Sequence, residues 1–185
     1  MKSGILLFGS VIILFLAAGG IGYLISIFNS LIQVKNNIGK AWGNIDVLLL
    51  QRNEEIPKLV DICKDYMTYE GELFAELAFL RTGYEKAKGT LEKTIIENKL
   101  KTSLNRLSFS GEQYPDLKAG EPFQRIMKRV SQLEETVADR RVFFNDSVAI
   151  YNTQIEKFPH RILAGILRYK PHPYLDLSVS RGQGR

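Results

Sequence analysis

Residues 121–158 read EPFQRIMKRVSQLEETVADRRVFFNDSVAIYNTQIEKF, and their apolar spacing decides the fold class. Apolar side chains recur at a strict seven-residue step, at Phe123, Val130, Val137, Phe144, Tyr151 and Phe158. A second set accompanies them, with Ile126 and Leu133 early and Val148 and Ile155 later. Because a seven-residue apolar repeat winds neighbouring helices into a left-handed supercoil, this stretch predicts one long helix in a coiled-coil-like bundle.

Shorter apolar patterns precede this stretch. Apolar residues at three- and four-residue steps predict helices over about 29–52, 54–87 and 90–108, and residues 113–122 predict a loop. Pro57 either occupies the first turn of a helix capped by Asn53 or kinks one long helix. No run alternates apolar and polar residues as a strand does. The predicted fold is all-α: an N-terminal transmembrane helix followed by a long antiparallel three- to four-helix bundle.

The transmembrane helix is predicted from Ile5–Phe28, ILLFGSVIILFLAAGGIGYLISIF, which runs 24 residues without a charge. A helix of this length spans about 36 Å, more than the roughly 30 Å of hydrocarbon in a bilayer. A cleaved signal peptide is the alternative, with Lys2 as its charged region, but its apolar core is typically about 7–15 residues long. We therefore expect an uncleaved signal anchor in the cell membrane.

Small residues recur within this span. Ala18, Gly22 and Ser26 share one helix face, which would let two membrane helices pack closely. Small residues are also common in membrane helices generally, so both interpretations stay open. Three basic residues follow the span within the next 24 residues, against Lys2 before it, which favours a cytoplasmic body by the positive-inside rule.

The net charge of +5 lies at the two ends of the chain, since residues 29–158 contain 19 basic and 19 acidic side chains. A nucleic-acid partner is therefore not expected. After Pro159 the chain mixes apolar residues with Arg161, Arg168, Tyr169 and Lys170, a composition that suits an anionic lipid surface. A strap that packs back on the bundle is the alternative. We divide the chain into a transmembrane anchor (1–28), a bundle (29–158) and a basic, partly disordered tail (159–185).

Residues that carry chemistry are few. The chain has one cysteine, Cys63, and two histidines, His160 and His172. It contains no catalytic-triad pattern, phosphate-binding loop or metal-ligand spacing. Cys63 shares an apolar face with Leu59 and Leu73, so we interpret it as a packed, inert thiol. The sequence predicts no catalytic residue, no metal site and no cofactor.

Polar residues on predicted core faces are the remaining candidates. Glu70 lies seven residues from both Cys63 and Leu77 on the predicted second helix. We expect its carboxylate to pair with Arg140 or Arg141 of the last helix and to fix the register of the bundle. A catalytic or metal-binding role for Glu70 is the alternative.

Four further polar residues belong to the same predicted network. We interpret Asn44 and Asp46 on the first helix in the same way as Glu70, as buried polar partners with a catalytic or metal-binding role as the alternative. Arg141, Asn145 and Asn152 fall at four- and seven-residue steps along one stripe of the last helix. This stripe is either an interface to another subunit or a ladder of hydrogen bonds between helices.

Two specific strings occur in the chain: Ala-Trp-Gly-Asn-Ile-Asp at 41–46 and Tyr-Pro-Asp-Leu-Lys-Ala at 114–119. In their order and spacing, they resemble the LemA family of bacterial membrane proteins. Shorter matches occur at 28–31, 52–53, 56–60, 140–146, 151–152, 158–159 and 163–165. Departures are modest: Gly43 replaces a common Ser, Phe144 a common Tyr, and Tyr69 precedes Glu70 where His-Glu is usual.

The resemblance implies one N-terminal membrane helix carrying a helical bundle, without an established enzyme activity. Together with the uncharged span and the seven-residue pattern, it favours a non-enzymatic membrane scaffold or adaptor that acts through homo-oligomers and an unidentified protein partner. One branch of the family is tied to the biogenesis of magnetosome membranes, so a membrane-remodelling or organelle-biogenesis factor that binds anionic lipid through its tail is the alternative. A hydrolase with a buried carboxylate and a secreted bundle are the remaining hypotheses.

Overall fold

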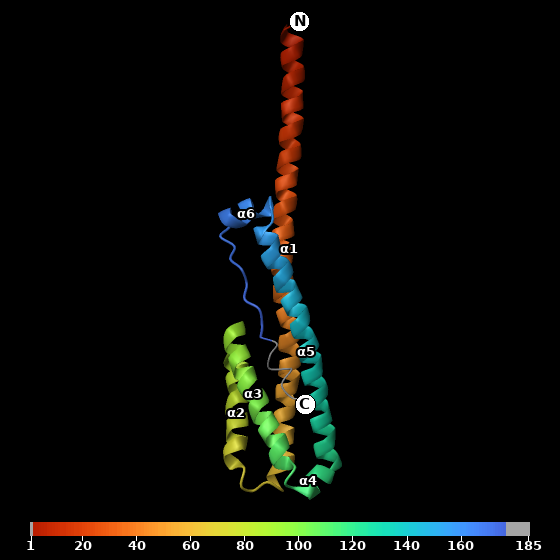
Figure 1. Ribbon diagram of the computed structural model, residues 1–185, viewed down its shortest axis with the longest axis vertical. Helices are drawn as coiled ribbons and strands as arrows, with labels where there is room; N and C mark the ends of the chain where they lie inside the picture. Colours follow the sequence, from red (N-terminus) through yellow and green to blue (C-terminus); the bar gives the residue numbers. More distant parts are fainter. Residues whose placement is uncertain (1, 177–185) are drawn as a thin grey trace. The chain divides into compact units, whose positions relative to one another are not determined.

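The computed structural model describes the backbone of residues 2–176 and the side chains of residues 11–176. This part of the chain contains six helices and no strand (Figure 1). The helices are α1 (Lys2–Lys64), α2 (Gly71–Lys86), α3 (Thr90–Gly111), α4 (Pro115–Ala119), α5 (Glu121–Glu156) and α6 (His160–Ile166). The predicted all-α class, with a long N-terminal apolar helix and a helical bundle, is confirmed. The predicted disorder of the last residues falls outside the described part.

The chain forms two compact units, and both α1 and α5 contribute to each. The first unit comprises the chain up to Ala41 together with Phe143–Asp176; the second comprises Trp42–Val142 among the described residues. The division predicted from the sequence, into 1–28, 29–158 and 159–185, remains a prediction.

The second unit is a four-helix bundle built from parts of α1 and α5 together with α2 and α3. Each helix buries one apolar stripe, which includes Ile45, Leu49, Ile56 and Leu59 on α1, Leu73, Leu77 and Leu80 on α2, Leu100, Leu104 and Leu107 on α3, and Val130, Leu133 and Val137 on α5. Side-chain contacts fix the helix directions: Asp46 meets both Tyr84 and Lys93, whereas Glu76 meets Arg106. Neighbours α2 and α3 therefore run antiparallel (Figure 1).

The predicted helix over 54–87 is wrong, because the chain breaks between Lys64 and Gly71. Helix α1 continues through Pro57 to Lys64, so of the two alternatives for Pro57 the single long helix is found. A turn follows, in which the amide of Met67 donates to the carbonyl of Cys63. Met67 is buried in this turn, so the three- and four-residue apolar steps run on across the break and conceal it.

The predicted loop over 113–122 contains a short helix. Helix α4 begins at Pro115, which is favoured in a first helical turn because its missing N–H has no partner to lose there. Leu117 is 1% exposed and anchors this turn against the bundle. The connection between α3 and α5 is therefore packed.

The first unit brings α1, the C-terminal part of α5, α6 and the segment after it together. Its core includes Ile27 and Leu31 of α1, Phe144, Val148, Tyr151 and Ile155 of α5, and Ala164 of α6. Five of the six residues of the seven-residue pattern are thus buried in one unit or the other. Phe158 is 77% exposed, because α5 ends at Glu156 and Pro159 follows.

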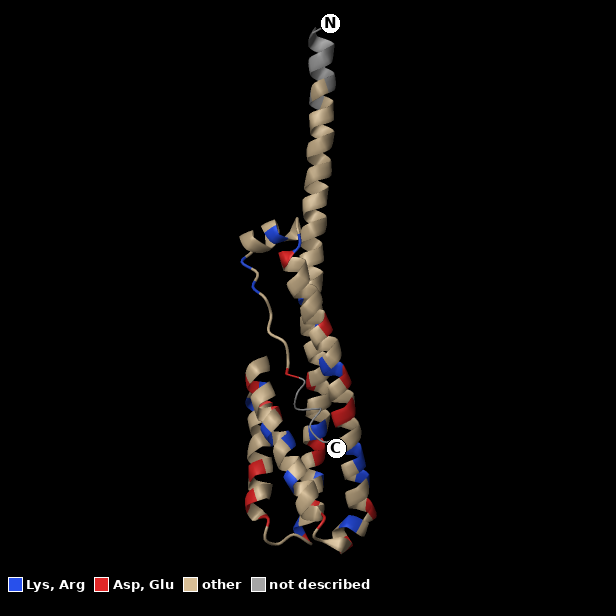
Figure 2. Ribbon diagram, in the orientation of Figure 1, with Lys and Arg blue, Asp and Glu red and all other residues tan. Residues whose placement is uncertain are grey.

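The N-terminal part of α1 carries exposed apolar side chains and no charge between Val11 and Phe28 (Figure 2). Leu14, Phe15 and Leu16 are between 69% and 82% exposed. The helix is long and apolar enough to cross a membrane, and it is the candidate span among the described residues. Ala18, Gly22 and Ser26 lie on this exposed stretch.

Candidate functional site

A buried ionic cluster lies in the second unit. Arg52 of α1, Glu97 of α3 and Arg141 of α5 are 1%, 2% and 7% exposed. The guanidinium of Arg52 binds both carboxylate oxygens of Glu97, with Nη1 2.9 Å from Oε1. Nη2 of Arg141 lies 3.5 Å from the same Oε1. One carboxylate thus holds together three helices.

The cluster carries two positive charges for one negative charge. Arg52 Nε has no hydrogen-bond partner among the described residues, and neither has the buried amide of the neighbouring Asn53. A small cavity of about 20 Å³ adjoins the three side chains and is also lined by Lys101 and Glu134. Its size suits a single water molecule, which would hydrate the cluster.

The prediction that Glu70 pairs with Arg140 or Arg141 is wrong. Glu70 is half-buried at the residue before α2, because the chain turns where the sequence predicted helix. The carboxylate that meets Arg141 is that of Glu97, and Arg140 is exposed. Sequence reasoning missed Arg52 and Glu97, although each lies in phase with buried apolar residues of its helix.

Asp46 is the centre of a second polar contact. The hydroxyl of Tyr84 donates to its carboxylate at 2.7 Å, and Nζ of Lys93 lies 2.7 and 2.8 Å from its two oxygens. Burial, followed by the hydrogen bond to Asp46, raises the pKa of Tyr84. The phenol therefore remains a donor. Asn44, predicted in the same network, is exposed.

Asn145 and Asn152 hold the C-terminal segment Tyr169–Asp176, which we call the strap. Nδ2 of Asn145 donates to the carbonyl of Leu175 at 2.9 Å, and the amide of Leu175 donates to its Oδ1 at 2.8 Å. Asn152 makes the same pair of bonds with His172, at 3.0 and 2.8 Å. Both asparagines thus bind backbone rather than a helix, so the predicted ladder between helices is wrong for them.

Aromatic contacts continue along the strap. The hydroxyl of Tyr151 donates to the carbonyl of Lys170 at 3.1 Å, and its ring faces that of Tyr169 at 6.4 Å between centroids. Nζ of Lys35 lies 4.6 Å from the centre of the Tyr169 ring. Burial and the neighbouring Tyr169 raise the pKa of Tyr151. Of the two alternatives for the tail, this part packs back on its own unit.

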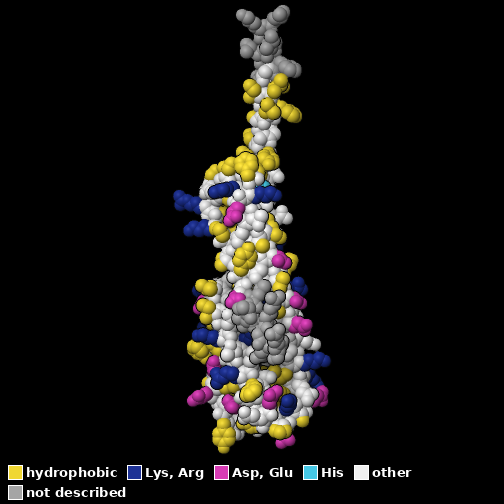
Figure 3. All heavy atoms as spheres, viewed as in Figure 1, with side chains coloured by type: hydrophobic (Ala, Val, Ile, Leu, Met, Phe, Trp, Pro, Cys, Tyr) yellow, Lys and Arg dark blue, Asp and Glu magenta, His cyan; other side chains and the backbone are white. Residues whose placement is uncertain are grey.

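Helix α6 presents a different surface. Ile162 and Ile166 are 57% and 72% exposed, and Arg161 and Arg168 are also exposed. In the space-filling view, hydrophobic side chains at the level of α6 lie beside those of α1, with Lys and Arg side chains just below them (Figure 3). The predicted membrane-surface residues therefore divide: Arg161, Arg168 and Lys170 are exposed, whereas Tyr169 is half-buried.

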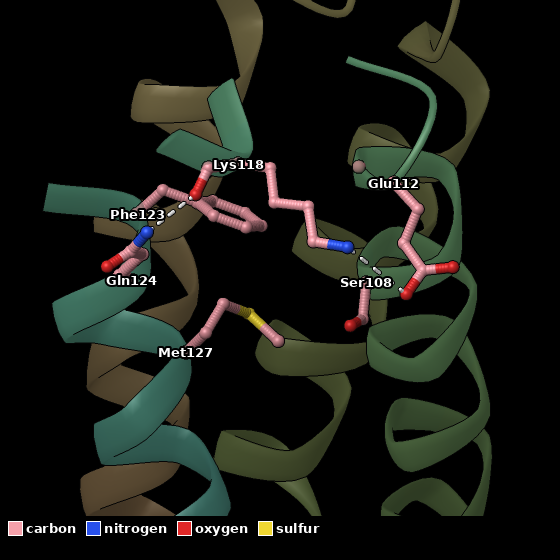
Figure 4. A pocket seen from close by; sticks show the side chains of 7 residues that line it. Ser108, Glu112, Lys118, Phe123, Gln124 and Met127 are labelled. Carbon is pink, nitrogen blue, oxygen red and sulfur yellow. Dashed lines mark hydrogen bonds and ion pairs between the residues drawn. The ribbon is translucent and has the colours of Figure 1, made fainter. Parts of the chain in front are cut away.

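A cavity lies at the end of the second unit that holds α4. It measures about 300 Å³ and is lined by Ser108, Gly111, Glu112, Lys118, Phe123, Gln124 and Met127. Figure 4 shows the Phe123 ring and the Met127 side chain facing it, and an ion pair of 3.8 Å between Lys118 and Glu112 beside them. These seven residues include no histidine or cysteine. Among the described residues, no three His, Cys, Asp or Glu gather to hold a metal ion.

Comparison with known proteins identifies the family. The chain is 23% identical to Magnetosome protein MamQ 2 of Paramagnetospirillum magneticum, over 84% of this chain and 67% of that protein. It is 24% identical to Magnetosome protein MamQ of Magnetospirillum gryphiswaldense, over 80% of this chain and 64% of that protein. It is also 24% identical to Protein LemA of Metamycoplasma hominis, over 80% and 68%. The profile of the LemA family matches residues 41–183, and the chain therefore belongs to that family.

Proposed function

We propose that this protein is a non-enzymatic, single-pass membrane scaffold that acts through self-association and a protein partner. The observation that carries the proposal is the course of α1, a single helix that joins an exposed, uncharged apolar segment to two packed units. Exposed side chains such as Leu14 and Phe15 have no place to be buried within the described chain, and lipid would cover them. The body stands on the cytoplasmic side.

The polar centres support a structural rather than a chemical role. The carboxylates of Glu97 and Asp46 are each engaged by cations at hydrogen-bond distance, so neither is left to act as a base. We infer that the cluster of Arg52, Glu97 and Arg141 fixes the register of the bundle, as buried polar groups do in some coiled coils. A rigid bundle with fixed register is what a scaffold requires.

Self-association in the membrane tests the proposal. Two differently tagged full-length copies are expressed together, and one tag is captured from membranes dissolved in mild detergent. We expect the second copy to co-purify. Gly22→Leu should lower the yield, because it fills the face of Ala18, Gly22 and Ser26, whereas Tyr23→Leu on another face should not. Recovery of one copy alone from the wild type would contradict self-association.

A second function is supported by α6: binding of anionic lipid at the membrane surface. Its exposed Ile162 and Ile166 belong to the same unit as the apolar part of α1, and Arg161, Arg168 and Lys170 flank them. An in-plane helix buries apolar residues among headgroups, while each nearby basic residue adds about 1 kcal/mol of attraction to an anionic surface. This is the arrangement that a membrane-remodelling factor, such as one of magnetosome type, would need.

Fluorescence tests the lipid contact. In a Cys63→Ala background, an environment-sensitive dye is attached at Ile166→Cys, and the protein is placed in vesicles with and without anionic lipid. We expect a blue shift in anionic vesicles that Arg161→Gln/Arg168→Gln reduces. The control dye at exposed Thr102→Cys of α3 should not respond. If anionic lipid shifts the emission of the two dyes equally, or shifts neither, lipid binding by α6 is contradicted.

A further inference from the structure

Two asparagines of α5 bind backbone amides and carbonyls of the strap at a fixed spacing. Asn145 and Asn152 are seven residues apart, which is about 10.5 Å along a helix. Their partners, Leu175 and His172, are three residues apart, which is about 9.3 Å in an extended polyproline-type chain. The two lengths match closely enough for both amides to bind in register. This surface, made by Phe144, Asn145, Tyr151 and Asn152, is hereafter the strap groove.

The groove imposes a pattern on its occupant. The amides of His172 and Leu175 must be free to donate, whereas Pro171 and Pro173, which have no N–H, occupy positions that make no such bond. Proline also holds the chain extended before it binds, which lowers the entropy lost on binding. His172 adds an edge contact with the ring of Phe144, 5.9 Å between centroids.

The strap is held by its backbone more than by its side chains. No side chain in Tyr169–Asp176 is buried, and Pro171, Pro173 and Tyr174 are exposed. Segments with few buried apolar contacts open at low cost in free energy. The strap can therefore leave the groove without disrupting a core.

The hinge that connects the strap to α6 is strained. Arg168 adopts φ 54°, in the left-handed region that residues other than glycine rarely occupy. Arg168 has this conformation while the strap lies on its own groove. Strained hinges favour exchange of a segment between identical chains, because the open hinge relaxes while every contact of the segment is remade in the neighbour.

We propose that the strap groove also binds the strap of a second copy of this chain, so that copies anchored in one membrane link through exchanged straps. The proposal rests on the self-association proposed above and names the contact that produces it. The segment known to fit the groove is the chain's own, and anchoring in one membrane raises its local concentration on neighbouring copies. Exchange from each chain to the next is a head-to-tail contact that builds rings or rows.

Two full-length variants separate the partners of this contact. The first, His172→Pro/Leu175→Pro, removes both donating amides and keeps the groove. The second, Asn145→Ala/Asn152→Ala, removes the groove and keeps the strap. Tyr174→Pro is the matched control, since the amide of Tyr174 makes no hydrogen bond in the described chain.

Association is measured in mild detergent from the molar mass of each protein and of their mixture. We expect each variant alone to associate roughly tenfold more weakly than the wild type, since the proline variant loses two hydrogen bonds of the strap and the alanine variant loses four. Mixing the two variants should restore mixed particles, because one supplies the strap and the other the groove. Tyr174→Pro should behave as the wild type, and Arg168→Gly, which relaxes the closed hinge, should shift the equilibrium towards monomers.

The possible results are distinct. If both variants associate as the wild type does, another surface links the copies, and strap exchange is wrong while the scaffold proposal stands. If the variants are monomeric and their mixture stays monomeric, the strap acts within its own chain and exchange is again wrong. A monomeric wild type overturns both proposals. Circular dichroism of each variant, with the wild-type helical signal expected, excludes loss of folding as the cause.

Discussion

Glu97 is the residue on which the second unit depends most, because its carboxylate faces two buried guanidinium groups. Glu97→Gln leaves Arg52 and Arg141 without a counter-charge, and removing one partner of a buried ion pair typically costs about 3–5 kcal/mol. We expect a loss of this size in the free energy of unfolding, measured by urea titration of the helical signal. Glu85→Gln, in the exposed pair with Arg81, should change it by less than about 0.5 kcal/mol. Equal small losses in both variants would contradict a structural role for the cluster.

The thiol of Cys63 gives stability a dependence on pH. Burial raises its pKa from the model-compound value of 9.0 to about 11. As pH rises, the thiol therefore loses its proton in the unfolded state before it does so in the folded state. The free energy of unfolding falls between these two pH values. From about pH 8 to about pH 10 this lowers the free energy of unfolding by roughly 1 kcal/mol.

Cys63→Ala is the matched variant for this effect. It should be less stable at every pH because it leaves a cavity, but its stability should fall less between about pH 8 and about pH 10. Urea midpoints of both proteins at several pH values supply the measurement. Parallel profiles for the two proteins would show that Cys63 does not carry the effect.

Among the elements, α4 shows how a five-residue helix can hold a bundle together. Leu117 is almost fully buried beneath the connection from α3 to α5. Leu117→Ala should cost about 2–5 kcal/mol, the range for a buried leucine that leaves a cavity. Phe109→Ala on the exposed face of α3 is the control and should be nearly neutral. Thermal unfolding of both variants checks the difference, and similar melting temperatures would contradict the anchoring role.

The elements also show which parts of the structure can be predicted from the sequence. The periodic patterns of α3 and α5 predicted those helices to within a few residues, since apolar spacing and packing agree there. The break at Asp65–Glu70 could not be predicted, because Met67 lies in the turn yet is buried. It therefore extends the three- and four-residue apolar spacing of a helix across the break. Glu97 could have been found by its phase with Leu100 and Leu104. The partners of Asn145 and Asn152 could not, because backbone atoms of an extended segment leave no side-chain pattern in the sequence.

At the scale of the whole molecule, α1 connects an apolar segment to two packed units, and the strap packs on the surface of the first unit. We propose that lipid covers the exposed residues of α1 and α6 and that the strap of a neighbouring copy binds the strap groove. Both proposed contacts, with lipid and with a second copy, involve molecules other than this chain. We therefore propose that the protein functions as an assembly in a membrane.

The mass of the full-length protein in mild detergent decides whether it forms such an assembly. Light scattering, corrected for bound detergent, gives the mass of the protein component, and electron microscopy of the same sample gives its symmetry. We expect a defined multiple of the 21.0 kDa chain, arranged as a ring or row. A monodisperse particle with the mass of one chain would contradict it.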